Sequence, residues 1–504
     1  MTAIEARQLR NHLEKSRMTS YDTNKKSSLP ESPINKWTWF LHLNRYHWFV
    51  LFVAALGWAF DTMDQQLFAL ARTPAMKELL VRVEVAENGD TVKVAPKIED
   101  VQYRAAISTS IFLVGWAIGG LIFGALGDRI GRARVMLWTI LMYSTFTGLS
   151  AFSNNFWDFS FYRFITGMGV GGEFAVGVAL VAEVMPQRVR TYALGLLQAS
   201  STIGNSVAAI CSMTLGYYEG QGTLADWGIF GFQMSAWRLM FIAGSLPALV
   251  AVLIRWKLKE PESWVQAKNM LQSNPSQKSL GSYRELFGDP RWRRNALVGL
   301  ALGSSGIVGL WGIGFFFFDL FSVVATKHFT DLGLAAGDVK SSASFWVGCS
   351  SLLMNFGGFF GMYFFSYFSN WVGRKFAMAV AFVLAMVSTS FTFAYLDQLS
   401  ELFWMVPIMG FCLFAPFGGY AIYFPELFPT RLRSTGTSFC YNGGRLVAAV
   451  GPLTLGLLTK FVYTKENGFD EGFRWGAVTM CAIFFVGLIV LPFAPETKDQ
   501  PLPE

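Results

Sequence analysis

The stretch GALGDRIGRAR, residues 124–134, decides the fold of this chain. Four of its eleven residues are charged, and it joins two apolar runs at roughly 105–126 and 135–153. A helix needs about 20 apolar residues to cross a bilayer. The stretch therefore predicts a short basic loop between two membrane-spanning helices.

The composition extends this interpretation to the whole chain. Apolar residues make up 53% of the 504 residues and charged residues only 15%, against about 25% charged in soluble proteins. So much apolar surface with so little charge excludes disorder and disfavours a soluble enzyme. None of the five cysteines or four histidines forms a cluster that could ligate a metal. We expect no metal, no cofactor and no nucleic acid as a partner.

About twelve apolar runs are long enough to span a membrane. The other ten lie near 46–71, 157–184, 191–216, 238–256, 295–325, 342–368, 375–396, 402–425, 435–459 and 473–493. Lys and Arg number 27 on one side of these runs and 12 on the other. Because basic loops stay inside, both termini are expected in the cytoplasm. A bacterial inner membrane is the expected location.

Two connections are long enough to carry structure of their own. Residues 72–104 contain VRVEVAENGDTVKV, whose alternation around Asn88-Gly89 predicts a hairpin. Residues 257–294 are basic and polar, as expected of a linker with short surface helices. The predicted organisation is a cytoplasmic tail at 1–45, a first bundle at 46–256 with an external hairpin insert near 72–104, a cytoplasmic linker at 257–294, a second bundle at 295–493 and a cytoplasmic tail at 494–504.

The chain contains a weak internal repeat. EVMPQRVR at 183–190 matches ELFPTRLR at 426–433, and DRIGR at 128–132 matches NWVGR at 370–374. A third pair is PES at 261–263 and PET at 495–497. Two similar halves indicate a transporter with its site between them, near the membrane midplane. The predicted fold class is an all-α integral membrane protein, with twelve transmembrane helices in two pseudo-symmetric six-helix bundles.

These motifs resemble the major facilitator superfamily over nearly the whole chain. Residues 124–134 resemble its loop 2–3 signature. Its fourth-helix signature is matched by Arg163, Gly167, Gly169, Gly171, Gly172 and Glu173. The PES and PET pieces are similar to those of sugar porters and of the related metabolite– and carboxylic-acid–proton symporters. DTMD at 61–64 and YNGGR at 441–445 look more like the acid symporters, and 299–318 lacks a sugar porter's paired glutamines.

The resemblance implies a charge network that closes the cytoplasmic side and breaks on opening. Its expected members are Asp128, Arg129, Arg132, Glu183, Arg188, Arg190, Glu426, Arg431 and Arg433. Asn370 replaces the second aspartate of the motif, so the second network is expected to be weaker. The alternative is that these basic groups only fix the topology.

Ionisable residues inside apolar runs indicate proton coupling, because they are costly in hydrocarbon. Asp61 and Asp64 share one helical face, and their depth predicts that one of them pairs with Arg163. Glu173 lies near the midplane and is expected to carry a proton or orient the substrate. The alternatives are a fixed ion pair, acids lining an outer vestibule, and a packing hydrogen bond from a protonated Glu173.

Arg445 is a basic group deep in the second half, and its guanidinium matches a carboxylate. With Tyr441 and Asn442 it is expected to bind an anionic substrate. Gln198, Asn205 and Asn355 are further candidates for lining the site. The alternatives are that Arg445 pairs with an acid or with carbonyls, and that the amides join helices.

The sequence therefore predicts a secondary active transporter. Its expected partners are a small-molecule substrate, protons and the lipid bilayer. Proton-coupled symport of a mono- or dicarboxylate or an aromatic acid, by alternating access, is the leading hypothesis. A proton-coupled sugar or polyol symporter is the alternative, and a non-transporting nutrient sensor is a remote one, because the tails are short. We expect the protein to act as a monomer and not as an enzyme.

Overall fold

The computed structural model of the chain describes residues 39–503, apart from 86–90, 221–222, 225–226, 230, 247–257, 274–279, 452–453, 456–457, 459–461 and 464–468. The chain divides into Met1–His42 and Leu43–Glu504. The described part of the first unit is the short helix η1 (Trp39–His42). Most of the predicted N-terminal tail, the Asn88-Gly89 turn and parts of the runs 238–256 and 435–459 lie outside the described residues.

Long helices dominate the second unit. Within the described residues, eight helical stretches are long and apolar enough to cross a membrane. They are Ile107–Ile130, Phe156–Val184, Gln187–Glu219, Pro290–Asp331, Gly337–Val372, Arg374–Tyr395, Leu399–Glu426 and Glu471–Phe493. The other predicted runs fall on α2, on α4, and on α7 and α16 with the undescribed segments that follow them.

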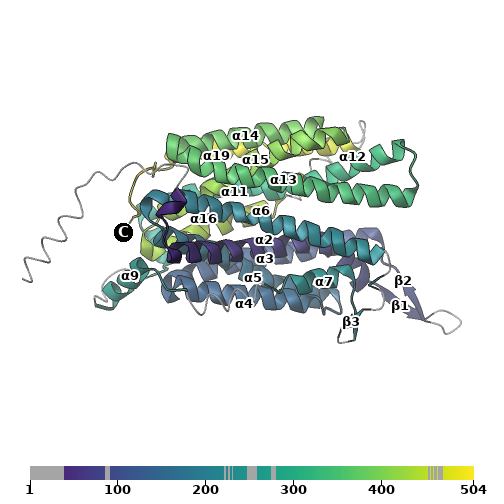
Figure 1. Cartoon of the computed structure of the whole chain (residues 1–504), viewed down its shortest axis with the longest axis horizontal. Coiled ribbons are helices and arrows are strands. Elements are labelled where there is room, and N and C mark those ends of the chain that lie inside the picture. The colour runs from purple at the N-terminus through teal and green to yellow at the C-terminus, as the bar shows by residue number, and fades with distance from the viewer. Residues whose placement is uncertain are drawn as a thin grey trace, which may run out of the picture. The chain divides into compact units, whose positions relative to one another are not determined.

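The first half is a bundle of helices that run side by side (Figure 1). They are α2 (Arg45–Leu79), α3 (Ile98–Ile130), α4 (Arg132–Ser150), α5 (Phe156–Val184), α6 (Gln187–Gly220) and α7 (Ala236–Ala243). Helix α3 packs on α5, and α2 packs on α6. A Cβ at Gly119 would lie 2.0 Å from the carbonyl oxygen of Met168, so the small residue allows α3 and α5 to meet.

The second half repeats this arrangement. Its elements are α11 (Pro290–Ile307), η2 (Val308–Ile313), η3 (Gly314–Phe316), α12 (Phe317–Asp331), α13 (Ala336–Val372), α14 (Arg374–Tyr395), α15 (Leu402–Glu426), α16 (Arg433–Ala448), α18 (Phe469–Met480) and α19 (Ile483–Val490). Helix α13 packs on α15, as α3 does on α5. The halves meet where α6 packs on α13 and α16 packs on α3.

The two ends of the bundle differ. At one end, β1 (Arg82–Val85) and β2 (Thr91–Val94) pair antiparallel at the place of the predicted hairpin. We call this the hairpin end. Helix α2 extends to Leu79, beyond the apolar run 46–71, because helical hydrogen bonding continues past the apolar residues. A second small hairpin there joins β3 (Gly228–Ile229) to β4 (Phe232–Gln233).

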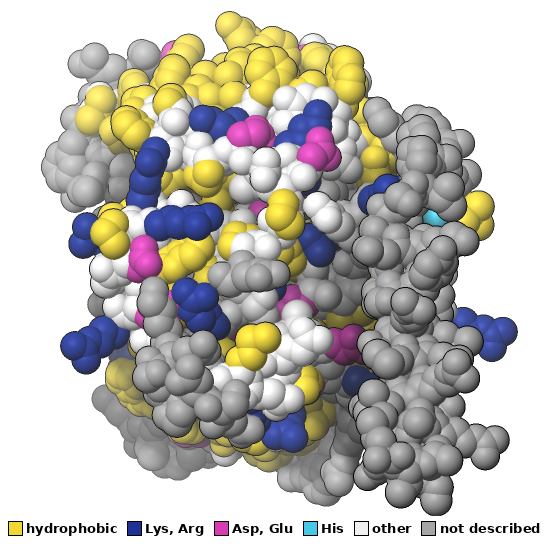
Figure 2. Space-filling model, turned by 90° about the vertical axis from the view of Figure 1, so that its left-hand side faces the viewer, with side chains coloured by type: hydrophobic (Ala, Val, Ile, Leu, Met, Phe, Trp, Pro, Cys, Tyr) yellow, Lys and Arg dark blue, Asp and Glu magenta, His cyan; other side chains and the backbone are white. Residues whose placement is uncertain are grey.

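The opposite end carries the short helices α9 (Glu262–Ser273) and α10 (Tyr283–Gly288) of the linker. We call it the linker end. Figure 2 views the molecule from this side: basic and acidic side chains gather on the face among a few hydrophobic ones, and hydrophobic side chains dominate its upper edge. A charged face bordered by apolar sides is the pattern expected where a helix bundle leaves the membrane.

Candidate functional site

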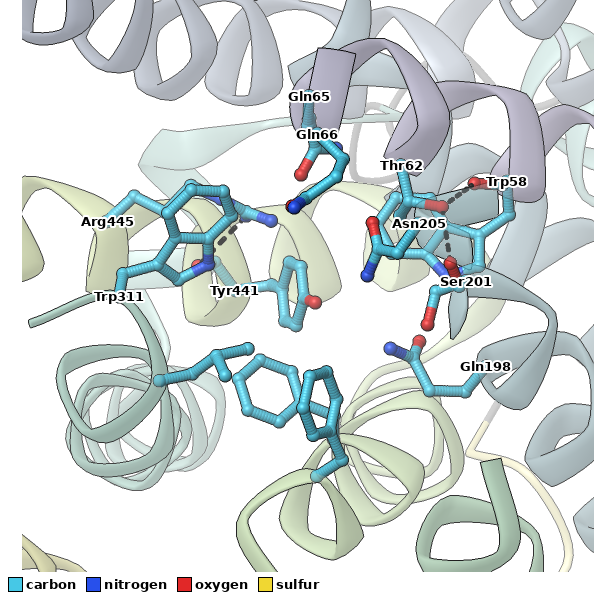
Figure 3. A pocket seen from close by; sticks show the side chains of 13 residues that line it. Trp58, Thr62, Gln65, Gln66, Gln198, Ser201, Asn205, Trp311, Tyr441 and Arg445 are labelled. Atoms are coloured by element: carbon cyan, nitrogen blue, oxygen red, sulfur yellow. Dashed lines mark hydrogen bonds between the residues drawn. The ribbon is translucent and has the colours of Figure 1, made fainter. Parts of the chain in front are cut away.

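A pocket of about 480 Å³, including space open to solvent, lies where the two halves face one another (Figure 3). Helices α2 and α6 of the first half and η2, α15 and α16 of the second half line it. The lining residues are Trp58, Thr62, Gln65, Gln66, Gln198, Ser201, Asn205, Leu310, Trp311, Phe414, Phe417, Tyr441 and Arg445. This position matches the expectation that the site lies between the halves.

Arg445 is the cation in this lining, and aromatic rings clamp it. Its guanidinium carbon lies 3.7 Å from the ring centroid of Trp116 and 4.3 Å from that of Tyr441. Its Nη1 donates to the Asn442 Oδ1 at 2.7 Å and to the Tyr441 carbonyl at 3.5 Å. Because Trp116 belongs to α3 and Tyr441 to α16, the clamp joins the two halves.

The remaining edge of the Arg445 guanidinium is open. Its Nε has no hydrogen-bond partner among the described residues, and no carboxylate within them lies at ion-pair distance. Removing an ion from water costs several kcal/mol, whereas a desolvated cation–π contact contributes about 2 kcal/mol. The aromatic clamp and one amide therefore compensate the buried charge only in part, and a carboxylate on the open edge would complete it.

The other predicted substrate residues divide into two groups. Gln198 and Asn205 line the pocket, as Tyr441 does, and Figure 3 shows them across the pocket from Arg445. Asn355 lies behind Asn205, whose Nδ2 donates to its Oδ1 at 3.0 Å. Asn442 lies behind Arg445 and donates to the Gly171 carbonyl at 3.2 Å. Asn355 and Asn442 therefore lie outside the pocket and support residues that line it.

Several lining residues escaped the sequence analysis. Gln65 and Gln66 come from the first span, and Trp311 comes from the interrupted seventh span. The adjacent glutamines inside an apolar run were a usable signal, because uncharged polar groups in lipid also need partners. Trp58 and Trp311 gave none, since the chain contains 17 Trp residues with similar apolar surroundings.

Asp64 is the acid that pairs with Arg163. Its Oδ1 lies 3.5 Å from the Arg163 Nη1 and accepts a hydrogen bond of 2.7 Å from the Thr147 hydroxyl. Arg163 also donates to the Ser150 hydroxyl at 2.7 Å and to the Thr166 hydroxyl at 3.1 Å. All of these groups are fully buried. The arrangement is a closed polar network beside the pocket.

Asp61 and Glu173 have far fewer partners. The Asp61 Oδ2 accepts one long hydrogen bond of 3.5 Å from Gln65, and its Oδ1 has none within the described chain. Neither carboxyl oxygen of Glu173 has a hydrogen-bond partner there. A Cβ at Gly57, one helical turn before Asp61, would lie 2.5 Å from the Glu173 Oε1. The two acids therefore occupy the same region between α2 and α5.

A second cluster of charges joins the halves at the linker end. Arg132 bridges Asp128 and Glu183, each at 2.9 Å, and Arg433 of the second half binds Glu183 at 2.8 Å. Asp128 also accepts the backbone N–H of Thr435 at 2.8 Å. We call Asp128, Arg132, Glu183, Arg433 and Thr435 the latch.

The second copy of the motif forms a smaller network. Arg374 binds Glu426 at 3.1 Å and donates to the Asn370 Oδ1 at 2.8 Å and to the Thr191 hydroxyl of the first half at 3.0 Å. Asn370 thus keeps a hydrogen bond but contributes no charge. Arg374 was quoted in the sequence motif but was not named as a member of the gating network.

The remaining candidates of the gating network lie around these two clusters. Arg431 binds Glu285 of the linker helix α10 at 2.8 Å, a partner that the sequence analysis missed. Arg129 donates to the Leu280 carbonyl at 3.2 Å, and Arg188 is exposed. Arg190 lies within electrostatic reach of Glu426 and Glu183. All of them belong to the linker end.

The third repeat pair includes one acid that caps a helix. Glu496 accepts the N–H groups of Arg374 and Lys375 at the start of α14, at 2.9 and 3.1 Å. At the start of α4 the same role belongs to Glu260, which accepts the N–H groups of Ala133 and Arg134. The PES and PET alignment had matched Glu262, two residues later, with Glu496.

Burial alone would raise the pKa of Glu496, but hydrogen bonds from the N–H groups of Arg374, Lys375, Lys498 and Thr497 hold it below its usual value. The carboxylate form is the better acceptor for these donors, and it also complements the positive end of the α14 dipole. Glu496 therefore lies outside the membrane-spanning part as a charged cap.

Comparison with known proteins agrees with this architecture. Residues 98–452 match the family model described as Major Facilitator Superfamily. The cis,cis-muconate transport protein of Acinetobacter baylyi is 28% identical, over 79% of this chain and 87% of that protein. The niacin transporter of the same organism is 24% identical, over 92% of this chain and 97% of that protein.

A solved structure shares the fold. The proton:xylose symporter bound to 6-bromo-6-deoxy-D-glucose superposes with a TM-score of 0.63 at 16% sequence identity, covering 91% of this chain and 98% of that one. At this identity the likeness concerns the fold alone. It confirms the predicted all-α architecture of twelve helices in two bundles.

Proposed function

This chain belongs to the major facilitator superfamily of membrane transporters, and we propose that it carries a small organic anion together with a proton. The premise is a multi-pass transporter, as expected from residues 124–134, and not an enzyme. The proposal concerns what is transported and how the transport is coupled.

The observation that carries the proposal is the buried Arg445 in the pocket between the halves. Arg445 lines a cavity that is otherwise lined mainly by aromatic and amide side chains, and its buried Nε has no hydrogen-bond partner among the described residues. An arginine presents a planar pair of donors that matches a carboxylate. Tyr441 and Asn442 hold the guanidinium in place, while Gln198 and Asn205 offer hydrogen bonds to the other end of the ligand.

The relatives support an acid as the substrate. Two of them are named for the transport of muconate and of niacin, and both compounds carry a carboxyl group. We extend that chemistry to this chain because Arg445 supplies the matching cation. The proposed substrate is a monocarboxylate, a dicarboxylate or an aromatic acid.

Proton coupling in this proposal rests on Asp61, Asp64, Arg163 and Glu173. These groups are buried beside the pocket, between α2 and α5, and buried ionisable groups mark proton pathways in transporters. The latch closes the linker end and would have to break when the halves rock apart. We place the linker end and both termini in the cytoplasm of a bacterial inner membrane, with the monomer as the working unit.

The test is uptake into de-energised cells in a weakly buffered suspension. Pulses of cis,cis-muconate, nicotinate and xylose are added while the external pH is recorded. We expect alkalinisation with a carboxylate, reduced about tenfold or more in Arg445→Gln because a charge-assisted bond is lost. Arg474→Gln is the matched control, since Arg474 binds Asp397 outside the pocket. Labelled carboxylate uptake without any pH change would refute proton coupling.

A neutral sugar or polyol is the second candidate. The amides Gln65, Gln66, Gln198 and Asn205 share the pocket, and amide side chains suit hydroxyl groups. In that case Arg445 is structural. Alkalinisation with xylose but with neither acid, largely retained in Arg445→Gln, would favour this candidate over the anion.

A further inference from the structure

Asp61 is a buried acid without a cation at ion-pair distance among the described residues. It is fully buried, and a single bond from Gln65, at 3.5 Å, reaches its carboxyl group. Its neighbour Asp64 already has Arg163 and Thr147. The charge of Asp61 therefore has to be balanced by something other than Arg163.

Stacked rings place Asp61 at the same level as Arg445. The Trp58 ring lies tilted against that of Phe174, with centroids 4.5 Å apart, and Phe174 stacks on Tyr441 with centroids 4.1 Å apart. Helices α2 and α16 both start at the linker end, where Tyr46 bonds to Lys259 and Arg433 joins the latch. Both helices thus run toward the hairpin end.

Asp61 and Arg445 each lie one turn further along from these rings. Asp61 follows Trp58 by three residues, and Arg445 follows Tyr441 by four. Three or four residues advance a helix by about 5 to 6 Å, so the two charges occupy one layer between α2 and α16. The charge of each acts on the other.

The other charged and titratable groups around Asp61 cannot replace Arg445 as its counter-charge. On α2 and α5 these are Asp64, Arg163 and Glu173, of which Arg163 is held by Asp64, Ser150 and Thr166. Helix α4 contributes Tyr143, whose hydroxyl has no partner within the described chain. Helix α6 contributes the uncharged Gln198 and Asn205.

We propose that Asp61 is the internal counter-ion of Arg445, and that a substrate carboxylate which binds the open edge of Arg445 takes over this role while Asp61 takes up a proton. This inference rests on the proposed anion transport and assigns the coupling to Asp61 and Arg445 in place of Asp64 and Arg163. One carboxylate and one proton enter together, so the charge in the pocket is unchanged. Glu173 stays protonated throughout, because it shares the site with Asp61 and has no cation of its own.

The first test needs no substrate. The carboxylic C=O band of the full-length protein in lipid nanodiscs is titrated by infrared difference spectroscopy, and Asp61→Asn identifies the contribution of Asp61. In Arg445→Gln the titration midpoint of Asp61 should rise by about one to three pH units, because the nearby positive charge is gone. Arg445→Lys should restore most of the wild-type midpoint, and Arg474→Gln should leave it unchanged.

An unchanged Asp61 midpoint in folded Arg445→Gln would overturn the proposal. A shift of the Asp61 band, instead of the Asp64 band, in Arg163→Lys would return the coupling role to Arg163. If Arg445→Gln does not fold, the binding test below still decides.

The second test follows nicotinate binding through the fluorescence of the pocket tryptophans. In the wild type the apparent Kd should rise about tenfold per pH unit above the Asp61 midpoint, since a proton must bind with the anion. In Asp61→Asn this slope should vanish, whereas Arg474→Gln, outside the pocket, should keep it. A pH-independent wild-type Kd would refute the proposal. If xylose binds and nicotinate and muconate do not, the proposed substrate class fails, while the infrared titration still decides the pairing of Asp61 with Arg445.

Discussion

The pairing of Asp64 with Arg163 predicts a strong coupling between two substitutions. Arg163→Gln alone leaves a carboxylate with only Thr147 in a fully buried site, and breaking a buried pair costs about 3–5 kcal/mol. The double variant Asp64→Asn/Arg163→Gln removes both charges and should recover much of this loss. Thermal unfolding of the purified protein measures the loss of stability in each variant. Equal destabilisation in Arg163→Gln and in the double variant would show that the charges of Asp64 and Arg163 do not stabilise one another.

At this scale the sequence predicted the charges better than their surroundings. Depth along the helices predicted that Asp61 or Asp64 pairs with Arg163, because lipid leaves an ionisable group few other options. The structure shows that the partner is Asp64. The sequence also located Arg445, but not the ring of Trp116 that covers it. That contact depends on how α3 meets α16, which no pattern within either helix encodes.

The amino end of α14 predicts a pH-dependent stability. The pKa of Glu496 is lowered in the folded protein, so its contribution is present above the ordinary glutamate value of 4.5 and is lost as the pH falls through the folded value. Glu496→Gln should lower stability by about 1 kcal/mol or less at neutral pH, and the difference should shrink in acid. The control is Glu262→Gln, in the first turn of α9. Unfolding curves at several pH values measure both, and an effect of equal size in the control would refute the capping role.

Helix interiors could be predicted from apolar runs, whereas their interruptions could not. The run 295–325 predicts one span, but the structure has α11, a π-helical turn at Val308–Ile313, a 3-10 turn and α12. Leu310 and Trp311 of that turn line the pocket. The apolar run has no residue type that marks a π turn, and such turns frequently lie at functional sites. The packing of α11 against α16 is a tertiary effect.

At the scale of the whole molecule, the two halves are joined by different chemistry at two levels. The latch joins them with charges at the linker end, and the aromatic clamp of Arg445 joins them beside the pocket. The internal repeat predicted that two halves exist and that the charges of the latch lie at the same end of both. It could not show that Asp128 binds backbone N–H groups of α16, because a backbone donor leaves no trace in the sequence.

Those backbone bonds give a direct measure of closure. Ser434 and Thr435 lie in the first turn of α16, where N–H groups have no partner within the helix. Their protection from hydrogen exchange therefore depends on Asp128 of the other half, which accepts them at 3.2 and 2.8 Å. Asp128→Asn weakens charge-assisted bonds of about 1.5–3 kcal/mol, so exchange at these two amides should accelerate about ten- to a hundredfold.

The amides of Arg374 and Lys375, capped by Glu496 within the second half, should exchange as in the wild type. Mass spectrometry of deuterated full-length protein resolves both sites. Unchanged exchange at 434 and 435 would mean that other members of the latch keep the linker end closed without Asp128, whereas faster exchange at all four amides would mean that the substitution loosens the second half and does not act on closure.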